Sequence, residues 1–208
     1  MPDYDLQEER INYLSHGVGA VLAFIAGILL IIKGAYLSTG QWLGLWAYAI
    51  SMVLLFSASM LYHMATAADR RYFYKKLDHT AIYYLIAGTY TPFLSIAIPT
   101  QKAQYLLIAL WIIALIGTLF KLVFINRFHK ISLIAYLVMG WLAVLVMDDM
   151  QAYLSSQALT FLLIGGIAYT VGALFYALKH VRYTHAIWHV FVLIGAVTHF
   201  LAIYLYVI

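Results

Sequence analysis

The sequence contains no cysteine and few charged residues. Without cysteine, a disulfide framework, a thiolate metal site and a cysteine nucleophile are all excluded. Charged residues make up 10% of the 208 residues and hydrophobic residues 65%, whereas about a quarter of a soluble domain is charged. So little polar surface cannot cover a water-facing globule. An ordinary soluble enzyme is therefore excluded, and lipid must cover much of the molecule.

The N-terminus also lacks the basic region of a secretory signal. Its first ten residues, MPDYDLQEER, carry four acids and one base, which is the wrong sign for the start of a signal peptide. We therefore expect no cleavable signal, and we expect the chain to enter the membrane through its first helix.

Long stretches without Asp, Glu, Lys or Arg have the length of membrane helices, which need about 20 mostly apolar residues. The sequence therefore predicts an all-α polytopic membrane protein with seven transmembrane helices. They are expected at roughly 17–37, 42–63, 77–98, 103–125, 131–149, 158–178 and 185–208. The connections are short, so we expect a short cytoplasmic N-terminal segment at 1–16 and a single seven-helix domain at 17–208.

The basic residues indicate an orientation. With seven spans, ten Lys and Arg residues share the side of the N-terminus: Arg10, Arg70, Arg71, Lys75, Lys76, Lys121, Arg127, Lys130, Lys179 and Arg182. Only Lys33 and Lys102 fall on the other side. The positive-inside rule then places the N-terminus in the cytoplasm and the C-terminus outside. Membrane anchoring and anionic lipid contacts account for the net charge of +4, so no nucleic-acid partner is expected.

Polar residues gather where three of the predicted spans meet the cytoplasmic side. Span two ends with Ser59–His63, span three opens with Lys76–His79, and span seven opens with His185–His189. Ionisable groups inside membrane spans are costly and usually mark function. Because all three helix ends lie at one membrane level, their side chains can converge.

The histidines among them have the spacing of metal ligands. His185 and His189 stand four residues apart and share one helical face, so two imidazoles can bind one ion. His63 can supply a third nitrogen. Three histidines and a water would form a tetrahedral site with one open position, the pattern of catalytic zinc (Zn²⁺) sites. Alone, the histidine pair can equally be structural, and His63 can cap its helix.

Two further residues of this layer suggest catalytic roles. Asp78 would hold the metal-bound water and take its proton, or bind the metal directly. Ser59 lies one turn deeper than His63 on the same face and can donate to an oxyanion of the substrate. The alternatives are an acid favoured by the helix dipole for Asp78 and a hydrogen bond within its own helix for Ser59.

A polar cluster also precedes the first span. Glu9, Asn12 and His16 lie on one helical face by their three- and four-residue spacing. They either form a polar start to the helix or a network that supports the metal site, with Asn12 and His16 bonding neighbouring helices. His199, near the middle of the seventh span, is too far from His189 to share its site, and we expect it to make a buried hydrogen bond.

These segments carry a family resemblance that covers residues 9 to 189. The motifs are Glu9-x2-Asn12-x2-Ser15-His16-x2-Gly19, Ser59-x3-His63, Asp78 within KLDHTAIY, AGTYTPF at 87–93, and His185-x3-His189. The chain resembles bacterial hemolysin III-type members of the progestin and adipoQ receptor (PAQR) family, in the superfamily that includes the alkaline ceramidases.

The resemblance implies a seven-helix fold with zinc near the cytoplasmic face of a bacterial inner membrane. It implies that His63, His185 and His189 bind the metal, that Asp78 positions water and that Ser59 assists the substrate. Long terminal extensions of the kind that receptor members carry are missing, which argues against hormone binding. The resemblance also implies a role in membrane lipid homeostasis, with membrane lipids or fatty acids as partners.

Three functions follow for testing. The first is a zinc-dependent hydrolase of a lipid amide or ester bond, with an acyl lipid as substrate. The second is a non-enzymatic sensor of bilayer state in which zinc ties spans two, three and seven together. The third, a pore-forming cytolysin, is disfavoured because strongly apolar spans with a positive-inside bias describe a resident membrane protein.

Overall fold

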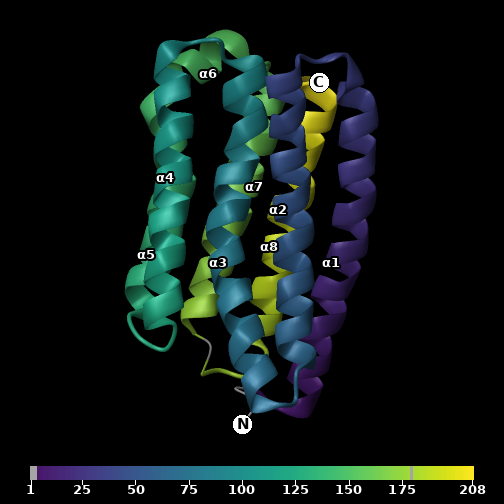
Figure 1. Cartoon of the computed structure of the whole chain (residues 1–208), viewed down its shortest axis with the longest axis vertical. Helices are drawn as coiled ribbons and strands as arrows, with labels where there is room; N and C mark the ends of the chain where they lie inside the picture. Colours follow the sequence, from purple (N-terminus) through teal and green to yellow (C-terminus); the bar gives the residue numbers. More distant parts are fainter. Residues whose placement is uncertain (1–3, 179) are drawn as a thin grey trace.

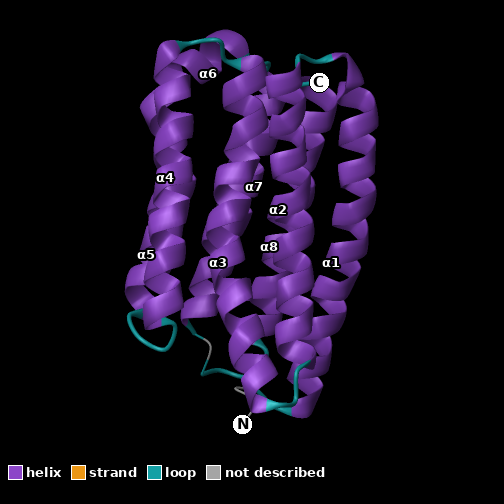
Figure 2. Ribbon diagram, in the orientation of Figure 1, coloured by secondary structure: helices purple, strands orange, loops and turns teal. Residues whose placement is uncertain are grey.

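The computed structural model describes residues 4–178 and 180–208, and within them the chain forms helices and loops with no β-strand (Figure 2). Residues 1–3 of the predicted N-terminal segment and Lys179 of the basic set lie outside the described residues. The α-helices are α1 Leu6–Lys33, α2 Thr39–Met64, α3 Ala68–Pro92, α4 Gln101–Phe124, α5 His129–Trp141, α6 Met147–Tyr153, α7 Ser156–Ala177 and α8 Thr184–Tyr206. Shorter turns are η1 Gly34–Tyr36, η2 Phe93–Ala97 and η3 Leu142–Val146.

The long helices stand side by side and form one bundle, with the chain termini at opposite ends (Figure 1). The closest helix pairs are α1 with α2, α2 with α3, and α7 with α8. Large apolar side chains cover the outside: Val21 is 61% exposed and Leu119 64%. Among the described residues, six helical segments are long and apolar enough to cross a membrane. These features confirm a multi-pass helical membrane protein.

The first helix begins well before the predicted span at residue 17. Asp5 caps it, because its carboxylate accepts hydrogen bonds from the backbone N–H groups of Glu8 (2.8 Å) and Gln7 (3.0 Å). The bond from Glu8 and the nearby Arg182 guanidinium lower the pKa of Asp5. Residues 6–16 are thus an amphipathic extension of α1, which carries the polar N-terminal cluster on its inward face.

Helix α3 also starts before its predicted span, and it is the one long helix absent from the six membrane-span candidates among the described residues. Its first eleven residues include charged side chains at Asp69, Arg70, Arg71, Lys75, Lys76 and Asp78. These charges lower its mean hydropathy, and they precede the charge-free stretch from which the sequence predicted the span at 77–98. The charged half continues the helix and places Arg71 beside the polar cluster of α1.

The predicted fifth span is interrupted in the middle. Helix α5 ends at Trp141, and η3 and the short α6 follow it. The hydroxyl of Tyr90 enters this break, donating to the Gly140 carbonyl (2.6 Å) and accepting from the Ala143 N–H (2.8 Å). Because lipid offers no hydrogen bonds to a broken helix, the tyrosine satisfies backbone groups that the irregular turn leaves unpaired.

Helices α2 and α3 approach closely at a glycine. A Cβ atom built on Gly88 would lie 2.3 Å from the Ser51 hydroxyl and 3.3 Å from the Ala47 carbonyl. Small residues allow such approach in membranes, where packing rather than the hydrophobic effect joins helices. This contact holds α2, which carries His63, against α3, which carries Asp78.

We predict that Gly88→Ala lowers the free energy of unfolding by about 1–3 kcal/mol, because the added methyl overpacks the contact. Gly40→Ala, where no atom lies within 4 Å of the added Cβ, is the matched control and should be neutral or slightly stabilising. Thermal unfolding in detergent measures both. Equal stability of the two variants would contradict close packing at Gly88.

Candidate metal centre

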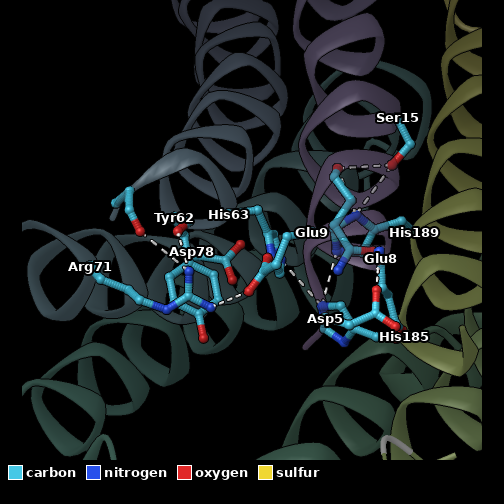
Figure 3. A network of polar contacts seen from close by, with 12 residues as sticks. Asp5, Glu8, Glu9, Ser15, Tyr62, His63, Arg71, Asp78, His185 and His189 are labelled. Atoms are coloured by element: carbon cyan, nitrogen blue, oxygen red, sulfur yellow. Dashed lines mark hydrogen bonds and ion pairs between the residues drawn. The ribbon is translucent and has the colours of Figure 1, made fainter. Parts of the chain in front are cut away.

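Three buried imidazoles meet near one end of the bundle (Figure 3). His63 comes from the last turn of α2, and His185 and His189 come from successive turns at the start of α8. The Nε2 atom of His185 lies 3.3 Å from Nε2 of His63 and 3.1 Å from Nε2 of His189. The structure thus brings together the three predicted ligands, and this group could hold a metal ion.

The outer nitrogens of two rings determine what the inner nitrogens offer. His63 Nδ1 lies 2.6 Å from a carboxylate oxygen of Glu9, and His189 Nδ1 lies 3.2 Å from the backbone carbonyl of Asn12. An ionised carboxylate and a carbonyl only accept hydrogen bonds, so both Nδ1 atoms donate. In their neutral form, which metal binding requires, the two rings direct their Nε2 lone pairs inward.

Two lone pairs therefore point at the same region as the Nε2 atom of His185. A single proton on Nε2 of His185 can donate a hydrogen bond to only one of these two lone pairs. A cation placed among the three nitrogens would satisfy all of them. The hydrogen bonds made by the outer nitrogens thus favour a metal-binding state of the cluster.

Glu9 links this cluster to α3. Its second carboxylate oxygen accepts a short hydrogen bond from Arg71, which also donates to the carbonyls of Tyr62 (3.2 Å) and Ala65 (3.4 Å) at the end of α2. Arg71 neutralises a carboxylate that would be costly to bury alone. From the sequence, Arg71 was expected only as one of the basic residues of the cytoplasmic side. The missed signal is the seven-residue spacing that puts Arg71 and Asp78 on one face of α3.

The other residues of the N-terminal cluster act in different ways from those expected. Asn12 uses its backbone carbonyl, and its side-chain amide has no hydrogen-bond partner among the described residues. The His16 ring stacks on His189 with centroids 3.6 Å apart and planes 11° apart. Ser15 adds a contact of 3.3 Å to His189 Nδ1. Backbone and ring contacts thus hold His189 in place.

Asp78 and Ser59 stand beside the histidines. The Asp78 carboxyl group interacts with the side chains of both Ser59 and His63, and its side chain is 14% exposed. His79, its neighbour, lies 3.6 Å from Asp78 through Nδ1 and 2.9 Å from the Lys75 carbonyl. The predicted catalytic pair is therefore close to the metal cluster, and its chemical roles stay predictions.

A cavity of about 160 Å³ reaches this cluster from the bundle interior. Asp78, Ser59 and two of the histidines line one part of it, and the rest of its wall is mostly apolar or aromatic. Tyr4, which the sequence analysis did not single out, also lines it and stacks on His185 with centroids 4.6 Å apart. The cavity thus has a mostly apolar wall and a polar end at the histidines.

Comparisons with known proteins agree with the motifs. The sequence profile of a family described as "Haemolysin-III related" matches residues 4–200. "Hemolysin-3 homolog" of Bacillus subtilis is 39% identical over 98% of this chain and 96% of its own length, and "Hemolysin-3" of Bacillus cereus is 39% identical over 98% and 93%. Human "Monocyte to macrophage differentiation factor" is 27% identical over 96% of this chain and 84% of its own length.

The contact between Glu9 and His63 gives a test of the metal centre. Glu9→Gln removes the carboxylate that holds His63, and we predict that affinity for added Zn²⁺ falls about 10–100-fold. Competition with a chromogenic chelator measures the affinity. The control is Asp69→Asn, which removes the same charge from an exposed position on α3. Wild-type affinity in a folded Glu9→Gln protein would contradict the supporting role of Glu9.

Proposed function

Because the chain belongs to the haemolysin-III-related family, we propose that it is an integral membrane zinc protein of lipid homeostasis. In this proposal it hydrolyses an amide or ester bond of an acyl lipid. One observation carries the proposal: three imidazole nitrogens converge at an apolar cavity, beside a carboxyl group and a hydroxyl. A zinc-dependent hydrolase of acyl lipids uses these parts: a metal site, a proton acceptor, a hydrogen-bond donor and an apolar pocket.

The donor set fits zinc. Imidazole suits zinc in a chain without thiolates. Two nitrogens bound at about 2.0–2.1 Å to one tetrahedral zinc ion lie roughly 3.3–3.4 Å apart, close to the contacts of 3.3 Å and 3.1 Å between His185 and the other two rings. Zinc bound there supplies a Lewis acid that polarises a carbonyl and makes water a nucleophile near neutral pH.

The residues around the metal site then have separate roles in the proposed hydrolysis. The apolar wall of the cavity holds the acyl chain and excludes bulk water. The Asp78 carboxylate accepts the proton that the attacking water loses and returns it to the amine or alcohol that departs as the bond to the acyl carbon breaks. The Ser59 hydroxyl donates a hydrogen bond to the oxygen on which negative charge develops. Glu9 and Asn12 keep His63 and His189 in the orientation that this chemistry needs.

We further propose that α3 also spans the membrane, which adds one span to the six candidates and makes seven. The membrane is a bacterial inner membrane, and the N-terminus lies in the cytoplasm. From Leu77 onward α3 contains no Lys, Arg or Glu and a single acid, Asp78, and it packs between α2 and α4. The start of α3, which carries Arg70, Arg71, Lys75 and Lys76, and the α4–α5 loop, which carries Arg127, lie at the end of the bundle where α1 begins (Figure 1). The positive-inside rule makes this the cytoplasmic end.

A second candidate is a sensor of bilayer state in which zinc is structural. The network of Glu9, His63 and Arg71 favours it, because these contacts tie α1, α2 and α3 together. Ser59→Ala separates the two functions. The hydrolase loses rate when the donor is removed, whereas the sensor keeps its full homeostatic activity.

Asp78→Asn tests the hydrolase. Loss of the proton acceptor should lower hydrolysis of a responsive ceramide or acyl ester by about 10²–10⁴-fold, with bound zinc retained. Release of fatty acid from a lipid panel measures the rate, and the exposed Asp69→Asn variant serves as control. Hydrolysis at the wild-type rate in Asp78→Asn would rule out this mechanism.

The absence of cysteine gives a clean test of orientation. Arg127→Cys lies in the α4–α5 loop, and Gln157→Cys lies at the start of α7, near the opposite end of the bundle. In right-side-out vesicles, an impermeant maleimide should label Gln157→Cys at once and Arg127→Cys only after the membrane is permeabilised. The reverse pattern would invert the proposed topology.

A further inference from the structure

The cavity extends beyond the metal centre to polar residues in the middle of the bundle. Its lining includes Tyr169 of α7 and His199 of α8. His199 follows His189 by ten residues on one helix, which places it about 15 Å farther along the helix axis. Apolar residues such as Leu85, Ile86 and Val192 line the same cavity. A ligand that fills it therefore meets polar groups at two levels.

The two deep rings sit on glycines of opposing helices. A Cβ atom on Gly165 of α7 would lie 2.4 Å from the His199 ring, and one on Gly195 of α8 would lie 2.7 Å from the Tyr169 ring. Each helix thus contributes one polar ring, and it also contributes one glycine that makes room for the polar ring of the opposing helix. Any larger residue at either glycine would displace a ring, so this arrangement is specifically accommodated by the sequence.

Both rings present polar atoms that nothing in the described residues satisfies. Nε2 of His199 donates to the Leu162 carbonyl at 3.2 Å, so Nδ1 is an acceptor, and it is buried without a partner. The buried Tyr169 hydroxyl has no partner either. Nor does the hydroxyl of Tyr48 on α2, a residue that interacts electrostatically with Tyr169. Such groups are costly to bury unless something binds them.

We propose that Tyr169 and His199 form a second polar binding site, which receives a hydroxyl group carried along the chain of a bound acyl lipid. A hydroxyl donates to Nδ1 of His199 and accepts from the Tyr169 hydroxyl, so one neutral group supplies both missing partners. No Lys, Arg, Asp or Glu among the described residues lines the cavity at this depth, so a charged group is disfavoured there. The inference rests on the ligand cavity of the proposed function and is independent of hydrolysis.

Binding of hydroxylated fatty acids tests the site directly. The probes are stearic acid and monohydroxystearic acids with the hydroxyl near the carboxyl end, in mid-chain or near the methyl end. Quenching of tryptophan fluorescence reports binding, because Trp141 and Trp188 line the cavity. We expect wild type to bind the mid-chain isomer about tenfold more tightly than stearic acid, as new hydrogen bonds to buried groups would give.

Tyr169→Phe should abolish this preference and leave the affinity for stearic acid unchanged. The exposed Tyr153→Phe serves as control and should keep the preference. The melting temperature of ligand-free Tyr169→Phe should equal or exceed that of wild type, because the hydroxyl removed has no partner in the protein. A lower melting temperature would reveal an internal partner and overturn the proposal.

Equal affinity of wild type for all the probes would also overturn the proposed hydroxyl site. Water alone would then be the partner of the Tyr169 and His199 polar atoms. Lack of binding by any probe would have the same consequence, as would a preference that survives in both Tyr169→Phe and His199→Phe. A protein that hydrolyses no lipid but prefers the mid-chain isomer would retain this site and lose only the proposed hydrolase.

Discussion

The contact between Glu9 and His63 is the interaction on which the rest of the centre depends. It sets the tautomer of one ligand, and through Arg71 it fixes three helices around the histidines. A carboxylate inside a membrane protein is tolerated only with a partner, and Arg71 provides one from the charged half of α3. The polar N-terminal extension of α1 is therefore part of the site. Without it, α2 and α8 would still bring imidazoles together, but nothing would determine which nitrogen faces inward.

The gaps between charged residues were enough to predict the helical bundle, because lipid-facing helices must be long and apolar. The spans predicted at 17–37 and 77–98 lie inside longer helices, because α1 and α3 begin before these apolar stretches. Glu9 and Arg71 are charged, yet they lie in helices inside the bundle because they pair with each other. The interruption of α5 was missed, since Tyr90, which fills it, is about fifty residues away in sequence. Contacts between residues so far apart in sequence cannot be predicted from local composition.

The candidate ligands could be predicted because two of them share a helical face and the third comes to the same membrane level. The supporting contacts could not, because they depend on which side chains cross between helices. The role of the Asn12 carbonyl and the stacking of His16 on His189 are of this kind. His199 was expected to make a buried hydrogen bond, and it makes one, to Leu162. Only the structure reveals that its second nitrogen is buried without a hydrogen-bond partner and that the residue lines the cavity.

The central claim is that the inward-facing imidazoles hold a metal ion, and that this ion is zinc. The most direct measurement is the metal content of the purified protein by plasma mass spectrometry, with wild type beside His189→Ala. Circular dichroism confirms that both remain helical. The account predicts about one zinc per chain in wild type and its loss in the variant. A folded wild-type protein that carries no metal after purification without chelators, and takes up none when Zn²⁺ is added, would contradict it.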